Sequence, residues 1–218
     1  MTDVFREVDE EVRREQLKKL WERYQYLVYG VVFLIVFGVG GWRVYEWYET
    51  RRATETGTRF EIALEQSDDG KHEEAERGFA QIAADGTSGY RSLARLREAA
   101  ELARRDAATA AALYRQTAND GSIDPALREI AALRAAALMI DQNSTEEARK
   151  LLEPLAEAGK TFRHSARELL AIAAWRSGDM TVLRRWYAQM ITDPDTPPAT
   201  RGRVEMLLTL GPATEGKS

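Results

Sequence analysis

The feature that most restricts this chain is a stretch near its N-terminus that contains no charged side chain. It runs from Tyr24 to Trp42, about 19 residues, which as a helix would be about 28 Å long. That length matches the hydrocarbon core of a bilayer, and the centre of the stretch, residues 27–39, is densely apolar. We therefore predict a transmembrane helix over residues 24–42.

Aromatic residues mark both ends of this stretch, as in the aromatic belts of membrane proteins. They are Trp21, Tyr24, Tyr26 and Tyr29 at one end, and Trp42, Tyr45, Trp47 and Tyr48 at the other. One alternative is a buried core helix, which would not need aromatic residues at both ends. A cleaved signal peptide is another, but the run is long, starts late, and is followed by no small-x-small cleavage site. We expect an uncleaved anchor.

Basic residues suggest the orientation of this anchor. Six precede the span and four follow it, namely Arg6, Arg13, Arg14, Lys18, Lys19 and Arg23, then Arg43, Arg51, Arg52 and Arg59. Basic residues near a span favour the cytoplasmic side. The difference is small, and it favours a cytoplasmic N-terminus with the C-terminal domain exported.

Residues 1–23 form an N-terminal arm with the pattern of an amphipathic helix. Apolar residues recur at helical spacing between interleaved charges, and we take Phe5, Val8 and Val12 as its candidate contact residues. Such a helix either continues the span as a solvated segment, or lies on membrane lipid or a protein partner.

The remainder of the chain is predicted to be all-α. It is rich in Ala, Glu, Arg and Leu, which favour helix, and it shows no period-two alternation. Glycines at positions where helices would end in a left-handed residue are Gly70, Gly86, Gly121, Gly159, Gly178 and Gly211. Helix starts are predicted at Asp124-Pro125, at a capping box from Ser144 to Glu147, and at Thr196-Pro197.

Four helical segments of this region resemble one another. Each begins with a small or apolar anchor, at Ala75, Ala110, Ala148 and Leu183, so the period is about 35 residues. A large residue follows four positions later, at Phe79, Tyr114, Leu152 and Tyr187. About eleven residues before each anchor lies an apolar position of a preceding helix, at Leu64, Ala99, Ala137 and Ile172.

Two helices per unit at this period are the tetratricopeptide (TPR) pattern, although the usual Gly and Tyr of the first helix and the closing Pro are mostly missing. We expect degenerate TPR-like hairpins over residues 59–210, with residues 199–210 as a terminal capping helix. Residues 43–58 are assigned to a juxtamembrane helix or linker, and residues 211–218 to a disordered tail. A helical bundle without repeats is the alternative.

Nothing in the sequence predicts catalysis, so we expect a protein that is not an enzyme and takes no cofactor, metal or small-molecule substrate. There is no cysteine, no phosphate-binding loop, and no HExxH or GxSxG motif. The two histidines, His72 and His164, lack partners at ligand spacing. The net charge of −4 without a basic run argues against nucleic acid. The cluster Trp175, Trp186 and Tyr187 either lines a ligand groove or packs between hairpins.

The chain resembles the YfgM-like family of ancillary SecYEG translocon subunits, of alphaproteobacterial type. The resemblance is carried by the arm, VFREVDEEVRREQLKKLW at residues 4–21, by the span, and by GGWRVY at residues 40–45. It implies an inner-membrane protein whose TPR-like domain lies in the periplasm. Its implied partners are translocon subunits, a membrane-bound periplasmic chaperone and exported client proteins. The alternative is a membrane-bound adaptor with its repeats on the cytoplasmic face.

Overall fold

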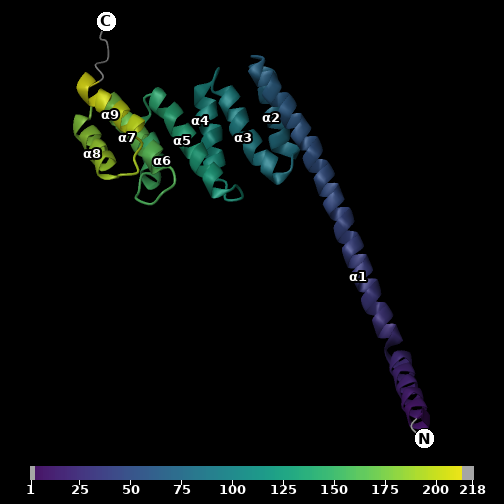
Figure 1. Cartoon of the computed structure of the whole chain (residues 1–218). Coiled ribbons are helices and arrows are strands. Elements are labelled where there is room, and N and C mark those ends of the chain that lie inside the picture. The colour runs from purple at the N-terminus through teal and green to yellow at the C-terminus, as the bar shows by residue number, and fades with distance from the viewer. Residues whose placement is uncertain (1–2, 213–218) are drawn as a thin grey trace. The chain divides into compact units, whose positions relative to one another are not determined.

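The computed structural model describes residues 3–212, with side chains from Lys18 onward except those of Lys19, Leu20, Glu22 and Val28. The chain divides into two units, Met1–Arg52 and Ala53–Ser218. Within the described range every regular element is helical, as the sequence predicts (Figure 1). The elements are α1 (Asp3–Asp68), α2 (His72–Asp85), α3 (Ser88–Leu102), α4 (Ala107–Asn119), α5 (Pro125–Asp141), α6 (Thr145–Leu152), the 3-10 helix η1 (Glu153–Leu155), α7 (Arg163–Arg176), α8 (Met180–Thr192) and α9 (Pro198–Leu210).

The first unit is the N-terminal part of α1. Its described large apolar side chains between Tyr24 and Trp42 are 46–78% exposed. The segment of α1 that starts at Arg23 is long and apolar enough to cross a membrane, judged by length and composition, with a mean hydropathy of 1.9 and none of the apolar window buried. None of the described residues of this unit covers these side chains.

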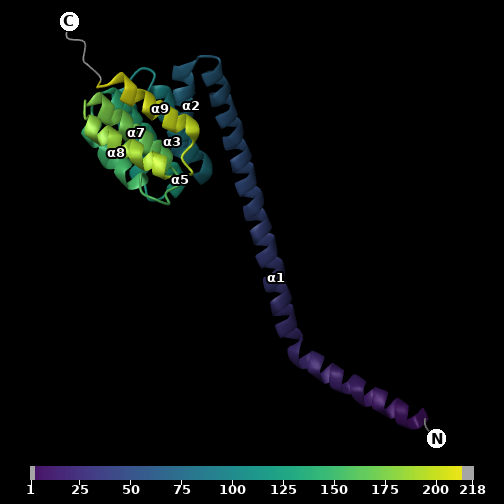
Figure 2. The same cartoon turned by 60° about the vertical axis from the view of Figure 1, so that its left-hand side comes forward.

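The second unit is a stack of helical hairpins. From α2 onward each helix packs on the next, and α9 closes the stack by lying against both α7 and α8 (Figure 2). The odd-numbered helices also contact one another, α3 with α5, α5 with α7 and α7 with α9. The even-numbered helices make no comparable contact with one another. One side of the stack is therefore closed by the odd-numbered helices, whereas α4, α6 and α8 stand further apart.

Small residues set the distance between packed helices. All four predicted anchors, Ala75, Ala110, Ala148 and Leu183, are completely buried. The large residues Phe79, Tyr114 and Leu152 are buried as predicted. In the fourth repeat that prediction is wrong by one residue: Trp186 is buried and Tyr187 only partly so, because α8 turns its indole toward α7.

In three of the four repeats, the core position predicted on the helix before the anchor is also wrong by one residue. Ala99 is fully buried, but Leu64, Ala137 and Ile172 are only partly buried. The residues that enter the core instead are Ala63, Ala136 and Ala171, at most 1% exposed. In the first and fourth repeats the core takes the smaller of the two neighbours, Ala63 or Ala171, because a larger side chain would hold the packed backbones apart.

The predicted helix ends are confirmed in part. Gly70, Gly159, Gly178 and Gly211 have positive φ, but Gly86 has φ −68° and Gly121 is not left-handed. Gly86 is needed for space instead, since a Cβ there would lie 2.6 Å from the carbonyl oxygen of Ile82. After α5 the left-handed position is taken by Asn143 (φ 62°), which tolerates it better than other non-glycine residues.

Of the predicted helix starts, Asp124 is confirmed, because its carboxylate accepts a hydrogen bond from the Ala126 amide and Pro125 follows. The helix start predicted at Ser144 is confirmed, since α6 begins at Thr145 and Ser144 is its N-cap residue. The capping box itself is wrong: Ser144 makes no side-chain cap, and the carboxylate of Glu147 lies 3.7 Å from Arg115 instead. Thr196 does not cap α9 either, which begins at Pro198.

If small anchors determine the helix spacing, enlarging one must destabilise the stack. Ala110→Leu on α4 is expected to lower the free energy of unfolding by about 1–3 kcal/mol through overpacking. Ala112→Leu, on the exposed face of the same helix, is the matched control and is expected to be near neutral. Urea denaturation of the full chain in detergent, followed by circular dichroism, measures both, and equal effects would contradict this packing scheme.

Candidate interaction site

An interrupted helix creates the most distinctive region of the stack. α6 has 8 residues, whereas α4 and α8 each have 13. Pro154 lies in η1 directly after α6, and proline lacks the amide needed to continue the α-helical pattern. The chain then loops through Gly159, at φ 82°, to the start of α7. The final turns that the other even-numbered helices possess are therefore missing here.

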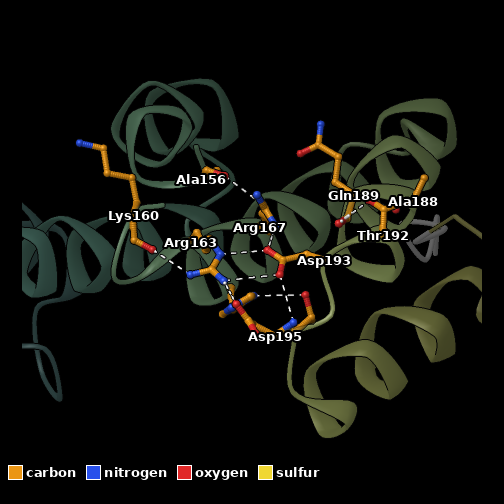
Figure 3. A network of polar contacts seen from close by, with 11 residues as sticks. Ala156, Lys160, Arg163, Arg167, Ala188, Gln189, Thr192, Asp193 and Asp195 are labelled. Carbon is orange, nitrogen blue, oxygen red and sulfur yellow. Dashed lines mark hydrogen bonds and ion pairs between the residues drawn. The ribbon is translucent and has the colours of Figure 1, made fainter. Parts of the chain in front are cut away.

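A buried arginine binds the loop to the neighbouring helices (Figure 3). The side chain of Arg167 on α7 is only 7% exposed. Its Nε donates to the carbonyl oxygen of Ala156 at 2.9 Å, and its Nη1 donates to the Asp193 carboxylate at 2.8 Å. Because a buried guanidinium without partners is very costly, both contacts are required for this packing.

Arg163, one turn earlier on α7, completes the network. Its Nε donates to Asp193 at 2.9 Å, and its Nη2 donates to Asp195 at 2.9 Å. The hydrogen bond from Arg163, reinforced by Arg167, holds the pKa of Asp193 far below its usual range. The same contact raises the pKa of Arg163. The network thus joins α7, the α6–α7 loop and the segment that follows α8.

A cavity of about 850 Å³ lies over this network, within the range of ligand-binding pockets. It is bounded by the loop after α6, by Arg163 and Arg167, and by Trp186, Gln189 and Thr192 on α8. Its volume lies where the missing turns of α6 would be. The sequence pattern did not predict this cavity, although Pro154 inside a repeat segment was an available signal.

The predicted aromatic cluster is divided by the structure. Trp186 belongs to the core and also borders the cavity, together with a second cavity of about 250 Å³ between α6, α7 and α8. Its indole N–H is buried and has no hydrogen-bond partner among the described residues. Trp175 packs against the core and donates to the carbonyl of Gly211, and Tyr187 packs against the same core. The packing alternative is therefore confirmed for all three residues, and a ligand groove at Trp186 stays a prediction.

The histidines lie in separate places and each has a local partner. His72 contacts the buried carboxylate of Glu101 at 2.8 Å, which also accepts from Ser67. His164 contacts the hydroxyl of Thr196 at 3.2 Å, and burial lowers its pKa. Among the described residues no group of three or more His, Asp or Glu side chains is arranged to hold a metal.

The candidate contact residues of the arm, Phe5, Val8 and Val12, lie in α1, but their side chains are outside the described residues. Their role stays a prediction.

Stacked antiparallel helical hairpins with a repeat near 35 residues and a terminal capping helix define a helical-repeat protein of the kind that binds other proteins. Residues 18–204 match the family model of the tetratricopeptide repeat-like domain, and the chain belongs to this family. No curated protein matches the sequence. No solved structure matches it either.

The Asp193 network predicts a pH dependence of stability. A carboxyl whose pKa is depressed by folding contributes stability above its unfolded pKa of about 3.9, and this contribution is lost as the pH falls below that value. Asp193→Asn is therefore expected to lower stability at pH 7 and to flatten the loss of stability between about pH 5 and pH 3. Urea midpoints of the full chain across this range measure both effects.

Two further variants serve as references for this experiment. Asp120, whose pKa is held at about 2 by Ser122 and Arg95, should behave like Asp193 when changed to Asn. Asp68→Asn, at an exposed position with no partner among the described residues, should leave the profile unchanged. A profile for Asp193→Asn that runs parallel to that of the unmodified protein would contradict the assigned role.

Proposed function

We propose that this protein is a membrane-anchored TPR-like scaffold, an ancillary subunit of the Sec translocon that assists the periplasmic chaperoning of exported proteins. The observation that carries the proposal is the family match. It spans residues 18–204, which include both the exposed apolar stretch and the hairpin stack. The TPR-like domain supplies a protein-binding scaffold, and the apolar stretch supplies the anchor.

The exposure of the apolar stretch supports the anchor. The described large side chains from Leu27 to Val39 are each about half or more exposed, which would be unfavourable in water but suits a bilayer. Beyond it, Arg51 lies 5.5 Å from the centre of the Trp47 ring, and Arg52 lies 5.8 Å from that of Tyr48. Such pairs of aromatic and basic side chains suit the headgroup region.

Two further observations support the direction of insertion and the partners. The surplus of basic residues before the span favours a cytoplasmic N-terminus, which puts the hairpin stack in the periplasm of the inner membrane. The resemblance to ancillary translocon subunits names the partners: translocon subunits, a membrane-bound periplasmic chaperone and exported clients. In this arrangement the arm, through Phe5, Val8 and Val12, is free to contact lipid or the cytoplasmic side of the translocon.

Membrane anchoring predicts a specific response to charge. The double change Leu34→Arg and Val36→Arg is expected to release the protein from membranes, since each arginine at mid-bilayer depth costs about 2.5–3.5 kcal/mol on insertion scales. Extraction of membranes with alkaline carbonate followed by immunoblotting measures the effect. Met206→Arg, at an exposed apolar position of α9, is the control and should remain in the membrane pellet. Retention of the double variant would contradict the anchor.

Protease accessibility tests the topology. In spheroplasts that carry a C-terminally tagged protein, added protease is expected to degrade the hairpin stack while the inner membrane is intact. A cytoplasmic protein followed in the same sample controls for lysis. Crosslinking to translocon subunits and exported clients then tests the partners. Protection of the tag until the membrane is lysed would overturn the export proposal and favour a cytoplasmic adaptor.

A further inference from the structure

The last helix of the stack, α9, has an outward face that carries no charge. α9 packs on α7 and α8, with Val204 completely buried between them. On the opposite side an exposed row follows the helical spacing and consists of Ala199, Gly202, Met206, Thr209 and Leu210. Met206 and Leu210 are 61% and 65% exposed, more than any other large apolar side chain described in the stack. The end of a repeat stack that faces water is polar on its outside, so this face has the composition of a contact surface.

The sizes of these side chains are ordered along the helix. Ala199 and Gly202 are small and come first, whereas Met206 and Leu210 are large and come last. A Cβ atom added at Gly202 would meet no atom within 4 Å, so space is open above this residue. If a second α9 lies antiparallel to the first about a point near Val204, each Met206 lies beside Gly202 of the other copy, and each Leu210 beside Ala199. A parallel copy would place large against large, so the face fits an inverted copy of itself.

The charges at the edges of this face have the same complementarity. Arg201 and Glu205 lie one turn apart on one edge, and neither pairs with any described residue. A two-fold axis brings equal edges together, so Arg201 of each copy lies beside Glu205 of the other. The two Glu205 carboxylates also approach each other, and the two arginines offset that repulsion. On the other edge Arg203 already donates from Nη2 to the Glu168 carboxylate at 2.8 Å and adds no unpaired charge.

The length of α9 limits the strength of such a pair. It has 13 residues and is about 20 Å long. One pair of helices this short buries less than the roughly 1,200–2,000 Å² of a standard stable interface. Two copies that share a membrane meet at a much higher effective concentration, which compensates for a small interface. The pairing is therefore suited to an anchored chain rather than to a dilute soluble one.

We propose that the outward face of α9 is the interface of a homodimer, in which the α9 helices of two copies pack antiparallel about a two-fold axis near Val204. The partner is a second copy because the chain's own α9 supplies the inverted order of sizes together with the matching charges. The geometry of this pair does not depend on the translocon role proposed above, but its strength in the cell depends on the anchor.

Disulfide crosslinking tests the proposal, because the chain contains no cysteine of its own. Ala199→Cys and Thr209→Cys, each with a different tag, are reconstituted together into liposomes and oxidised with copper phenanthroline. An antiparallel pair places these two positions opposite each other, so we expect a disulfide between the two variants. Either variant alone should crosslink little, because equal positions then lie about 15 Å apart along the axis. Ala112→Cys, on the exposed face of α4, is the control partner and should form no disulfide with Thr209→Cys.

A lysine at the open position tests whether this face makes the contact. Gly202→Lys is expected to lower the disulfide yield about tenfold or more, because an unpaired charge enters an apolar contact. The fold should tolerate the change, since nothing lies within 4 Å of the added Cβ. Gly89→Lys on α3, where the added Cβ is equally unobstructed, is the matched control and should leave the yield unchanged.

A charge exchange tests the edge pairs. Glu205→Arg is expected to lower the yield about threefold, as for loss of an exposed ion pair. Adding Arg201→Glu to the same chain reverses both partners and should restore the yield.

Four results would overturn the proposal. Ala199→Cys alone crosslinking as well as the mixture would exclude the antiparallel arrangement, and an unchanged yield with Gly202→Lys would place the contact elsewhere. Absence of any disulfide in liposomes would exclude the dimer. In cell membranes, crosslinking of Ala199→Cys to a different protein alone would assign the face to that protein. Reconstitution itself reports the anchor, so a failure of anchoring is seen before the crosslinking is measured.

Discussion

Close contact between helices at alanine is the constraint on which the hairpin stack depends. Where Ala75, Ala110 and Ala148 lie, no side chain beyond Cβ separates one helix from the next, and a large residue four positions later fills the space beside the crossing. The odd-numbered helices extend this contact to one another, so one side of the stack closes. The opposite side, formed by α4, α6 and α8, stays more open, and an irregularity in one of these helices can therefore produce a cavity.

The interruption of α6 is such an irregularity. Pro154 ends the helix, and the shortened element leaves a volume that Arg167 and Trp186 border without filling. The arginine is held by the Ala156 carbonyl and by Asp193, and these contacts keep the loop in place even though it has no regular structure. The same contacts stabilise the fourth hairpin and shape the cavity.

Anchoring and scaffolding would serve one purpose in this protein. A hairpin stack alone binds a partner at an affinity set by its surface, whereas tethering to a membrane raises the local concentration of any partner in the same membrane. Such tethering requires an apolar helix whose side chains are exposed, as the described large apolar side chains between Tyr24 and Trp42 are.

The sequence by itself determined the apolar stretch, the all-helical class, the period near 35 residues and the buried anchors, because each follows from local residue pattern. It did not determine which of two neighbouring residues enters the core. Trp186 is buried in place of the predicted Tyr187, and Ala171 in place of Ile172. The reason is that the rotation of a helix about its own axis is set by the helices packed against it. Pro154 could have indicated the interruption of α6, but the network beneath the cavity was decided by tertiary structure alone. Arg163 and Asp193 are 30 residues apart, and no local pattern indicates that a shortened helix will bring them together beneath an open volume.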